Sequence, residues 1–300
     1  MALSKLNRDV QGIILGQLCN PLEPRLAMYC SSVSSELRLL LTPAMRQKLR
    51  TDHEAAAALC REVRGNWSCK ELREAVLVSW GVKGLSTPYL ATLGTLGSVM
   101  PALRWLYLSE NSYDPYDPYY GGVIPDVQPL VAGLNAGALP AATGLNLFCM
   151  HVGDAGALEL GAALGRGALP RLQALGLIRA AIGDAGLVAL APALRQRPAL
   201  KDLCLIGNPF GDEGLAALVA PPPPAGALPL PTGGLKKLMR LNLDSTQVSD
   251  AGCAVLAAAL DNGALPALVY LTLDGIPASA AAKKAVDAAL ASKVESCLPS

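Results

Sequence analysis

The sequence is poor in the residues from which catalytic and ion-binding sites are usually built. Only 16% of its 300 residues are charged, 4% are aromatic, and two are histidines, His53 and His151. The formal net charge of +1 provides no electrostatic footprint for binding nucleic acid. Apolar residues make up 52% of the chain, which is too many for a disordered protein. We therefore expect a folded protein that does not bind nucleic acid.

The histidines and cysteines are not arranged for catalysis or metal binding. No two of the eight cysteines are closer than nine residues, so a C-x-x-C zinc motif is missing. His53 reads as an exposed helical residue, and His151 has no nucleophile at a recognisable elbow nearby. Phosphate-binding glycine motifs are also missing. We predict no enzyme activity, no metal and no cofactor, with reduced thiols in the cytoplasm or nucleus.

Long hydrophobic helices are missing as well. The two long uncharged windows, 127–153 and 214–235, are interrupted by prolines and glycines and cannot form an unbroken membrane-spanning helix. The N-terminus lacks the basic flank of a secretory signal. We expect a soluble chain with no membrane partner.

What the chain does contain is a repeated leucine phrase, L-x-x-L-x-L. Five clear copies begin at Leu103, Leu172, Leu200, Leu238 and Leu268, and two weaker copies begin at Leu72 and Ala142. The spacings run from 28 to 39 residues, and the two longest contain insertions at 113–120 and 221–231. Without these insertions the period is about 28 to 30 residues, which indicates an array of about seven repeats.

Between the leucine phrases the pattern changes to a helical one. Four tetrads with the pattern Gly/Ser-Asp-x-Gly precede apolar residues at helical spacing, and their aspartates are Asp154, Asp184, Asp212 and Asp250. We interpret each aspartate as the N-cap of its own helix, accepting N–H groups from the first turn. Gly-Ala-Leu-Pro segments at 137–140, 167–170 and 263–266 are expected to end helices. Each repeat is therefore a strand–turn–helix unit that buries its apolar face only by stacking.

Over residues 72–290 the chain resembles leucine-rich repeat proteins of the ribonuclease-inhibitor type. The resemblance implies an α/β solenoid, a horseshoe with parallel strands on its concave face and helices outside. The family's asparagine after the strand is present only at Asn111 and Asn208. The corresponding positions elsewhere are Trp80, Met150, Ala180, Thr246 and Ile276. We predict a helical module over 1–65, the repeat array over 66–292 and a tail over 293–300.

The N-terminal module resembles an F-box. Apolar residues at helical spacing precede a break at Pro21–Pro24, and a second helical stretch runs from Leu26 to Leu37. The resemblance implies docking on the Skp-type adaptor of a cullin–RING ubiquitin ligase, through Leu6, Ile13, Ile14, Leu18 and Leu26. The chain departs from the motif at Asn7, where the family usually has proline, and in lacking a tryptophan near Val33. The alternative is a helical cap over the end of the array.

Strand alternation predicts which side chains the concave face presents to a partner. From the strands these are Trp105, Tyr107, Phe148, Ile178, Asp202, Ile206, Arg240, Asp244, Tyr270 and Asp274, and from the first insertion Tyr113, Tyr116 and Tyr119. In the weak first copy we expect Glu74, Val76 and Val78 on the same face. One half of this face is apolar and the other is polar and acidic. The alternative is that Trp105, Tyr107 and Phe148 are partly buried beneath the insertion.

These features favour a protein–protein interaction scaffold that binds its partner on the concave face. A more specific form of this hypothesis is that the protein is the substrate receptor of a Skp–cullin–F-box ubiquitin ligase. The alternative is a regulator of a small GTPase, because the repeats resemble in length those of the GTPase-activating protein of Ran. A ribonuclease-type inhibitor is disfavoured, because those proteins bind basic enzymes through an acidic surface and this chain has a net charge of +1.

Overall fold

The computed structural model of the chain describes residues 5–62, 67–82, 86–110, 126–219 and 235–296. Both predicted insertions lie outside these ranges, as does Asn111. The strands of the described chain are β1 (Leu77–Val82), β2 (Trp105–Glu110), β3 (Gly144–Phe148), β4 (Ala174–Ile178), β5 (Asp202–Cys204), β6 (Arg240–Asn242) and β7 (Tyr270–Thr272). All seven belong to one parallel sheet, in the order in which they occur along the chain.

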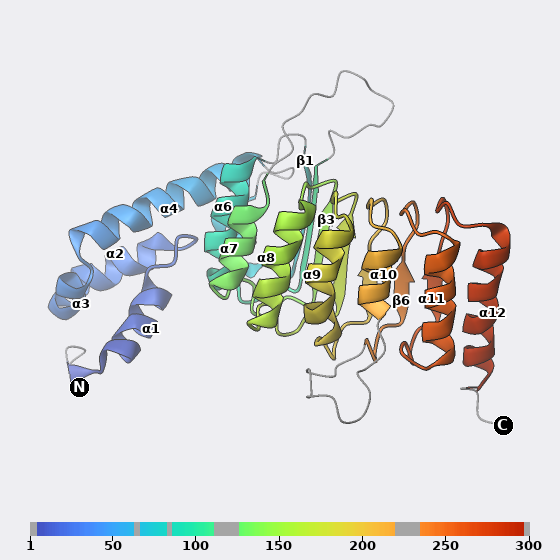
Figure 1. Ribbon diagram of the computed structural model, residues 1–300. Helices are drawn as coiled ribbons and strands as arrows, with labels where there is room; N and C mark the ends of the chain where they lie inside the picture. Colours follow the sequence, from blue (N-terminus) through green and yellow to red (C-terminus); the bar gives the residue numbers. More distant parts are fainter. Residues whose placement is uncertain (1–4, 63–66, 83–85, 111–125, 220–234, 297–300) are drawn as a thin grey trace, which may run out of the picture.

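Helices cover one side of this sheet in a single row (Figure 1). They are α6 (Thr87–Leu96), followed by the 3₁₀ turn at Gly97–Val99, α7 (Gln128–Asn135), α8 (Gly153–Gly165), α9 (Asp184–Arg195), α10 (Asp212–Val219), α11 (Asp250–Asp261) and α12 (Ala280–Ser296). Each strand is thus followed by its helix, as the leucine and aspartate patterns predict. Helix α12 ends at Ser296, so the tail predicted from 293 begins inside a helix.

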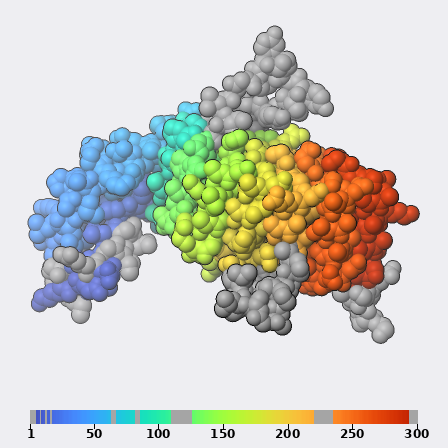
Figure 2. Space-filling view, in the orientation of Figure 1, coloured from blue at the N-terminus to red at the C-terminus, as the bar shows by residue number. Residues whose placement is uncertain are grey.

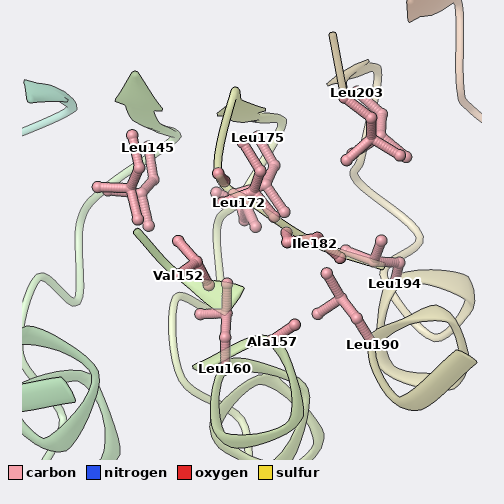
Figure 3. Close-up of a cluster of buried hydrophobic side chains, with 14 of the residues drawn as sticks. Leu145, Val152, Ala157, Leu160, Leu172, Leu175, Ile182, Leu190, Leu194 and Leu203 are labelled. Carbon is pink, nitrogen blue, oxygen red and sulfur yellow. The ribbon is translucent and has the colours of Figure 1, made fainter. Parts of the chain in front are cut away.

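The core lies between the sheet and the row of helices. Leu145, Leu175 and Leu203 are paired across three neighbouring strands and are all buried. Figure 3 shows them pointing toward Leu160 and Leu190, which come from the helices behind the sheet. Since successive strand residues point to opposite sides, burying one set of side chains against the helices leaves the other set on the uncovered side.

The recurring aspartates do not cap their own helices. Asp184 is the first residue of α9, and its Oδ1 accepts the backbone N–H of Gly211 at 2.9 Å and of Gly214 at 2.7 Å, at the start of α10. Equivalent bonds join Asp154 to Gly183 and Gly186, Asp212 to Ser249, and Asp250 to Ser279. Each carboxylate therefore satisfies unpaired N–H groups of the next repeat, and the interpretation as N-caps within one repeat is wrong.

This contact also explains the second glycine of the last three tetrads, Gly186, Gly214 and Gly252. A Cβ atom on Gly186 would lie 2.4 Å from Oδ1 of Asp154, and one on Gly252 would lie 2.2 Å from Oδ1 of Asp212. Neither glycine has a positive φ, so the constraint is close approach of the carboxylate and not backbone freedom. The glycine of one repeat is needed because the aspartate of the preceding repeat occupies the space of its side chain.

Asn208 joins two repeats from inside the fold. Its buried amide oxygen accepts the N–H groups of Ala180 and Ile182, both at 3.1 Å. Its Nδ2 donates to the carbonyl oxygens of Leu177 at 2.6 Å and Leu205 at 2.8 Å. One side chain therefore satisfies backbone groups of its own repeat and of the preceding one, where the equivalent residue is Ala180.

The helices end at the Gly-Ala-Leu-Pro segments, as the sequence predicts. The glycines Gly137, Gly167 and Gly263 have φ values of 87°, 99° and 69°. Their N–H groups donate to carbonyl oxygens of the preceding helical turn at 2.9–3.1 Å. This left-handed C-cap suits glycine, because glycine adopts positive φ without a steric penalty.

The register expected for the first repeat is wrong. In the structure Val78 pairs with Leu106 and Trp80 with Leu108, so both are buried against the helices and neither faces a partner. Glu74 is the last residue of α5 (Cys69–Glu74), and Leu77 occupies the position on the uncovered side. The expected register was wrong because Leu72, the first leucine of the weak phrase, belongs to α5 and not to the strand.

The N-terminal module contains α1 (Arg8–Leu18), α2 (Pro24–Val33), α3 (Ser35–Leu40) and α4 (Pro43–Glu62). The single helix expected over Leu26–Leu37 is two helices, because Ser34 has extended backbone geometry and its Oγ accepts the N–H of Leu37. Asn7, which departs from the F-box pattern, is the N-cap of α1 and its side chain accepts the N–H of Asp9 at 2.5 Å.

Helix α4 connects this module to the array. Its second half contributes Ala56, Leu59 and Cys60 to the main core, and α4 packs against α6. Its first half contributes Leu49 to a separate small cluster with Ala27 and Leu41. Figure 2 shows the module as a lobe beyond the first repeat. Leu22, in the turn before α2, also belongs to the main core, so the segment covers the end of the solenoid through α4 and this turn.

We expect Asp184→Ala to lower the free energy of unfolding by about 1–3 kcal/mol, because two N–H groups of the next helix lose their acceptor. Urea denaturation measures the change. Asp287→Ala, at an exposed position in the middle of α12, is the control and should change the stability by less than about 0.5 kcal/mol. Equal effects of the two substitutions would contradict the role of the inter-repeat carboxylate.

We expect Asn208→Leu to cost about 3 kcal/mol of folding stability, because it leaves two buried N–H groups and two carbonyl oxygens without a partner. Thr246→Val is the comparison: Thr246 is also buried but donates one hydrogen bond, to Leu243 O at 2.8 Å. Its loss should be near 1 kcal/mol. Denaturant melts in which Thr246→Val is the more harmful variant would show that Asn208 does not join the repeats.

Candidate functional site

The side of the sheet away from the helices, here called the open face, carries most of the residues predicted to bind a partner. The strand register arranges its side chains in rows across the sheet. The first row contains Leu77, Trp105, Gly144, Ala174, Asp202, Arg240 and Tyr270, and the second contains Ser79, Tyr107, Asn146, Gly176, Cys204, Asn242 and Thr272. The open face is therefore a continuous surface built from every strand of the described sheet.

Trp105 and Tyr107 form a stacked aromatic pair on β2. Their ring centroids are 5.9 Å apart and their planes differ by 8°. The indole of Trp105 lies over Gly144, since a Cβ there would be 2.0 Å from its Cε3 atom. Trp105 is half-buried and Tyr107 is exposed, so neither ring belongs to the core. The missing side chain at Gly144 allows the indole to lie across the neighbouring strand.

A shallow pocket of about 120 Å³ lies beside this pair. Its lining residues come from four strands: Trp105, Tyr107, Leu145, Asn146, Ala174, Leu175, Gly176, Asp202 and Cys204. Small residues, Ala174 and Gly176, lie between the aromatic pair and the polar residues of β5. This volume is below the 300–1,000 Å³ typical of small-molecule sites, and it fits a single protruding side chain.

In the polar half of the open face, several side chains already form hydrogen bonds to neighbouring groups of the same face. Asp202 accepts a hydrogen bond from Arg240 on the neighbouring strand, forming an ion pair. Oδ1 of Asp244 accepts the N–H of Asp274 at 2.7 Å. Burial raises the pKa of the Cys204 thiol, and the charge of Asp244 raises it further despite a hydrogen bond from the N–H of Ile206. Cys204 is therefore a protonated thiol and a poor nucleophile at neutral pH.

The remaining predicted residues extend the face without converging on one point. Phe148 and Ile178 are paired at the ends of β3 and β4, and Ile206 follows on the next repeat; all three are half-buried. Tyr270 is 53% exposed on the edge strand β7. It is five strands away from Trp105, roughly 24 Å. The predicted Tyr113, Tyr116 and Tyr119 lie outside the described residues.

Sequence reasoning missed two features of this face. Leu77 is 51% exposed beside Trp105 and extends the apolar end. The alternation of buried Val78 and Trp80 could have indicated this register. Asn146 lies over Gly176, where a Cβ would be 2.4 Å from its Nδ2. The pairing of a large residue with a glycine on the next strand is visible only once the register is known.

The N-terminal module exposes apolar side chains of its own. Leu26, Tyr29 and Val33 share one side of α2 at helical spacing, and Tyr29 and Val33 are each 67% exposed. Of the other residues predicted to bind an adaptor, Leu6, Ile14 and Leu18 are half-buried. The side chain of Ile13 lies outside the described part of the structure. Among the predicted residues whose side chains the structure describes, Leu26 alone is exposed, at 41%.

The part of the chain that the structure describes has few groups of residues that could form a catalytic or metal site. That part contains no group of three or more His, Cys, Asp or Glu residues able to hold a metal ion. His53 is only half-exposed, because its Nδ1 lies 2.7 Å from the carbonyl oxygen of Pro21. Among the described helices, none is both long and apolar enough to cross a membrane.

No family model and no curated protein matches this chain. Among solved structures it is similar to leiomodin-1 actin-binding site 2, with a TM-score of 0.41 and 15% identity over 55% of this chain and 88% of that chain. It is also similar to internalin C2 of Listeria monocytogenes, with a TM-score of 0.39 and 18% identity over 75% of this chain and 85% of that chain.

With both TM-scores below 0.5, the fold class rests on the chain's own geometry. Each repeat contributes one parallel strand and a helix, and the leucines of the strand are buried between them. This arrangement is that of a leucine-rich repeat array, and it leaves one face of a parallel sheet uncovered.

Proposed function

We propose that the protein is an interaction scaffold that binds a protein partner on the open face. The observation that carries the proposal is the stacked pair of Trp105 and Tyr107, held at the surface by the register of β2 and by Gly144. Contiguous exposed apolar patches mark interaction sites, and aromatic residues are enriched among those that dominate the binding energy of protein interfaces. The repeats are of the ribonuclease-inhibitor type in this proposal, because they carry full α-helices, and horseshoe curvature would make the open face concave.

The aromatic end is expected to contribute more binding energy than the acidic end. The carboxylates of Asp202 and Asp244 already accept hydrogen bonds within the sheet, so a partner would have to compete with them. Exposed charges such as Asp274 remain solvated and contribute little to affinity. The partner is therefore centred on β2–β4, with the polar residues of β5–β7 at the rim.

The proposal assigns no catalytic role, cofactor or metal to this chain. The thiol of Cys204, which lines the pocket of the open face, is kept protonated by burial. The pocket itself has room for one side chain of a partner and is small for a substrate. The cytoplasmic or nuclear location in this proposal rests on the reduced thiols that the cysteine spacing predicts.

A second proposal concerns α2. Its exposed stripe of Leu26, Tyr29 and Val33 supports docking of a Skp-type adaptor, and hence a role as substrate receptor of a ubiquitin ligase. A helix that only capped the array would turn its apolar side toward the array, which α4 does and α2 does not. The module therefore serves as a cap through α4 and as a docking element through α2. No feature of the described residues favours the GTPase-regulator alternative.

The partner is first identified by proximity labelling. We expect Trp105→Ala to weaken its binding by about 2 kcal/mol, which is about thirtyfold in affinity. Asp274→Ala should cost well under about 1 kcal/mol. Affinity is measured by calorimetry with purified proteins. A greater loss from Asp274→Ala than from Trp105→Ala would place the binding site at the other end of the open face.

The same variants need a test of folding, for which Trp80→Ala is the matched control. Trp80 is fully buried, so its truncation should cost about 3–5 kcal/mol of stability. Trp105→Ala should cost far less in urea denaturation, because its indole is only half-buried. Equal losses of stability in the two variants would mean that Trp105 is a core residue.

We expect Tyr29→Glu and Val33→Glu to abolish co-purification with a Skp-type adaptor while thermal unfolding of the repeats stays unchanged. A charge placed in the centre of an apolar interface cannot be solvated after docking. Thr51→Glu, at an exposed position of α4 off the stripe, is the control and should retain the adaptor. Failure of the unsubstituted protein to capture the adaptor would leave the module as a cap alone.

A further inference from the structure

The N-terminal module contains a groove that neither proposal above uses. It lies between α2 and α4 and has a volume of about 450 Å³. Its lining residues are Pro24, Met28, Pro43, Arg46, Gln47, Leu49, Arg50 and His53. We call it the α2–α4 groove. Figure 1 shows these two helices side by side at the end of the molecule away from the later repeats.

The groove is open and largely apolar in its lining. Met28 on α2 is 52% exposed and faces Pro43 and Leu49 of α4 across the groove. The buried apolar cluster beside the groove is small, with Ala27 of α2 and Leu49 of α4 joined by Leu41 from the segment between α3 and α4. An apolar hollow with its rim at the surface is typical of a site that is covered by a ligand.

Two arginines make the α4 wall basic. Arg46 and Arg50 are four residues apart, so they lie on the same side of the helix. In the described chain no carboxylate forms an ion pair with either guanidinium, whereas Lys48, on the turn between them, is paired with Asp52 at 2.7 Å. At the end of the groove, the ring of His53 is oriented by the carbonyl oxygen of Pro21. The groove therefore combines apolar walls with two unused positive charges.

We propose that the α2–α4 groove binds an acidic amphipathic segment of a partner protein, which inserts an apolar side chain between the helices and directs carboxylates to Arg46 and Arg50. Charge complementarity selects an acidic occupant. The open rim favours a protein segment over a small molecule, because a small ligand there would remain mostly in solvent. An amphipathic helix can lay its apolar side in such a groove and cover the open rim with the rest of its length. The inference does not depend on binding at the open face or on the α2 stripe.

The probe is a displayed library of helical peptides selected against the full chain. We expect enriched peptides to carry a Leu, Phe or Met anchor with Asp or Glu one helical turn away. Arg50→Glu should then weaken a selected peptide by about tenfold or more, and exchanging the peptide's acidic residues for lysine should restore binding to that variant. Lys48→Glu is the control, since it makes the same change of charge on the same helix outside the groove and should have less than about a twofold effect.

A second variant tests the groove without altering its charge. Gln47 is an exposed lining residue, so Gln47→Trp should fill the hollow and reduce peptide affinity about tenfold or more while thermal unfolding stays unchanged. Enriched peptides without acidic residues, or equal effects of Arg50→Glu and Lys48→Glu, would overturn the proposal. So would preferential binding of dodecanoate, which would assign the groove to a fatty acid, or a dimer that Gln47→Trp dissociates, which would assign it to a second copy of the chain.

Discussion

A carboxylate that reaches from the first turn of one helix to the start of the next determines how the repeats of this protein stack. Each of these aspartates accepts N–H groups that would otherwise have no partner at the helix N-terminus, where the helix dipole also favours a negative charge. At Gly186, Gly214 and Gly252 the carboxylate oxygen approaches the backbone so closely that a Cβ atom would lie 2.2–2.9 Å from it, so these positions need glycine. Together with the leucines between sheet and helices, it fixes both the spacing and the orientation of neighbouring repeats. The buried amide of Asn208 adds one more link of the same kind, on the strand side.

Because the repeats use only one face of the sheet for this purpose, the opposite face is free to carry function. Large and small side chains alternate across it: Trp105 lies over Gly144, and Asn146 lies over Gly176. This alternation places an aromatic pair beside a shallow pocket at one end, while Asp202 and Arg240 on the neighbouring strands form an ion pair. The open face thus has an apolar end and a polar end, and the proposed interface is centred on the apolar one, because the core of a protein interface is poor in charged residues.

The N-terminal module covers the open end of the array. Helix α4 extends the core past the first repeat with Ala56, Leu59 and Cys60, and an edge-to-face contact joins Trp67 to Trp80, with ring centroids 6.4 Å apart. Burial and the neighbouring Cys69 raise the pKa of Cys60 to about 12, so that this thiol is an inert core residue. The helices α1–α3 contribute little to the main core. Their exposed apolar stripe and the α2–α4 groove are therefore available for partners.

The period of the leucine phrase, the helix-ending glycines and the alternation along the later strands were readable in the sequence, because each depends on local geometry that recurs in every repeat. The position of the open face followed from the same alternation, except in the first repeat, where an apolar helical residue imitates the phrase. Which groups the aspartates bind, why Trp105 stays at the surface and where Arg46 and Arg50 point were decided only by the tertiary structure. These features depend on atoms that lie next to one another across repeats or helices, and a spacing along one chain does not specify those neighbours.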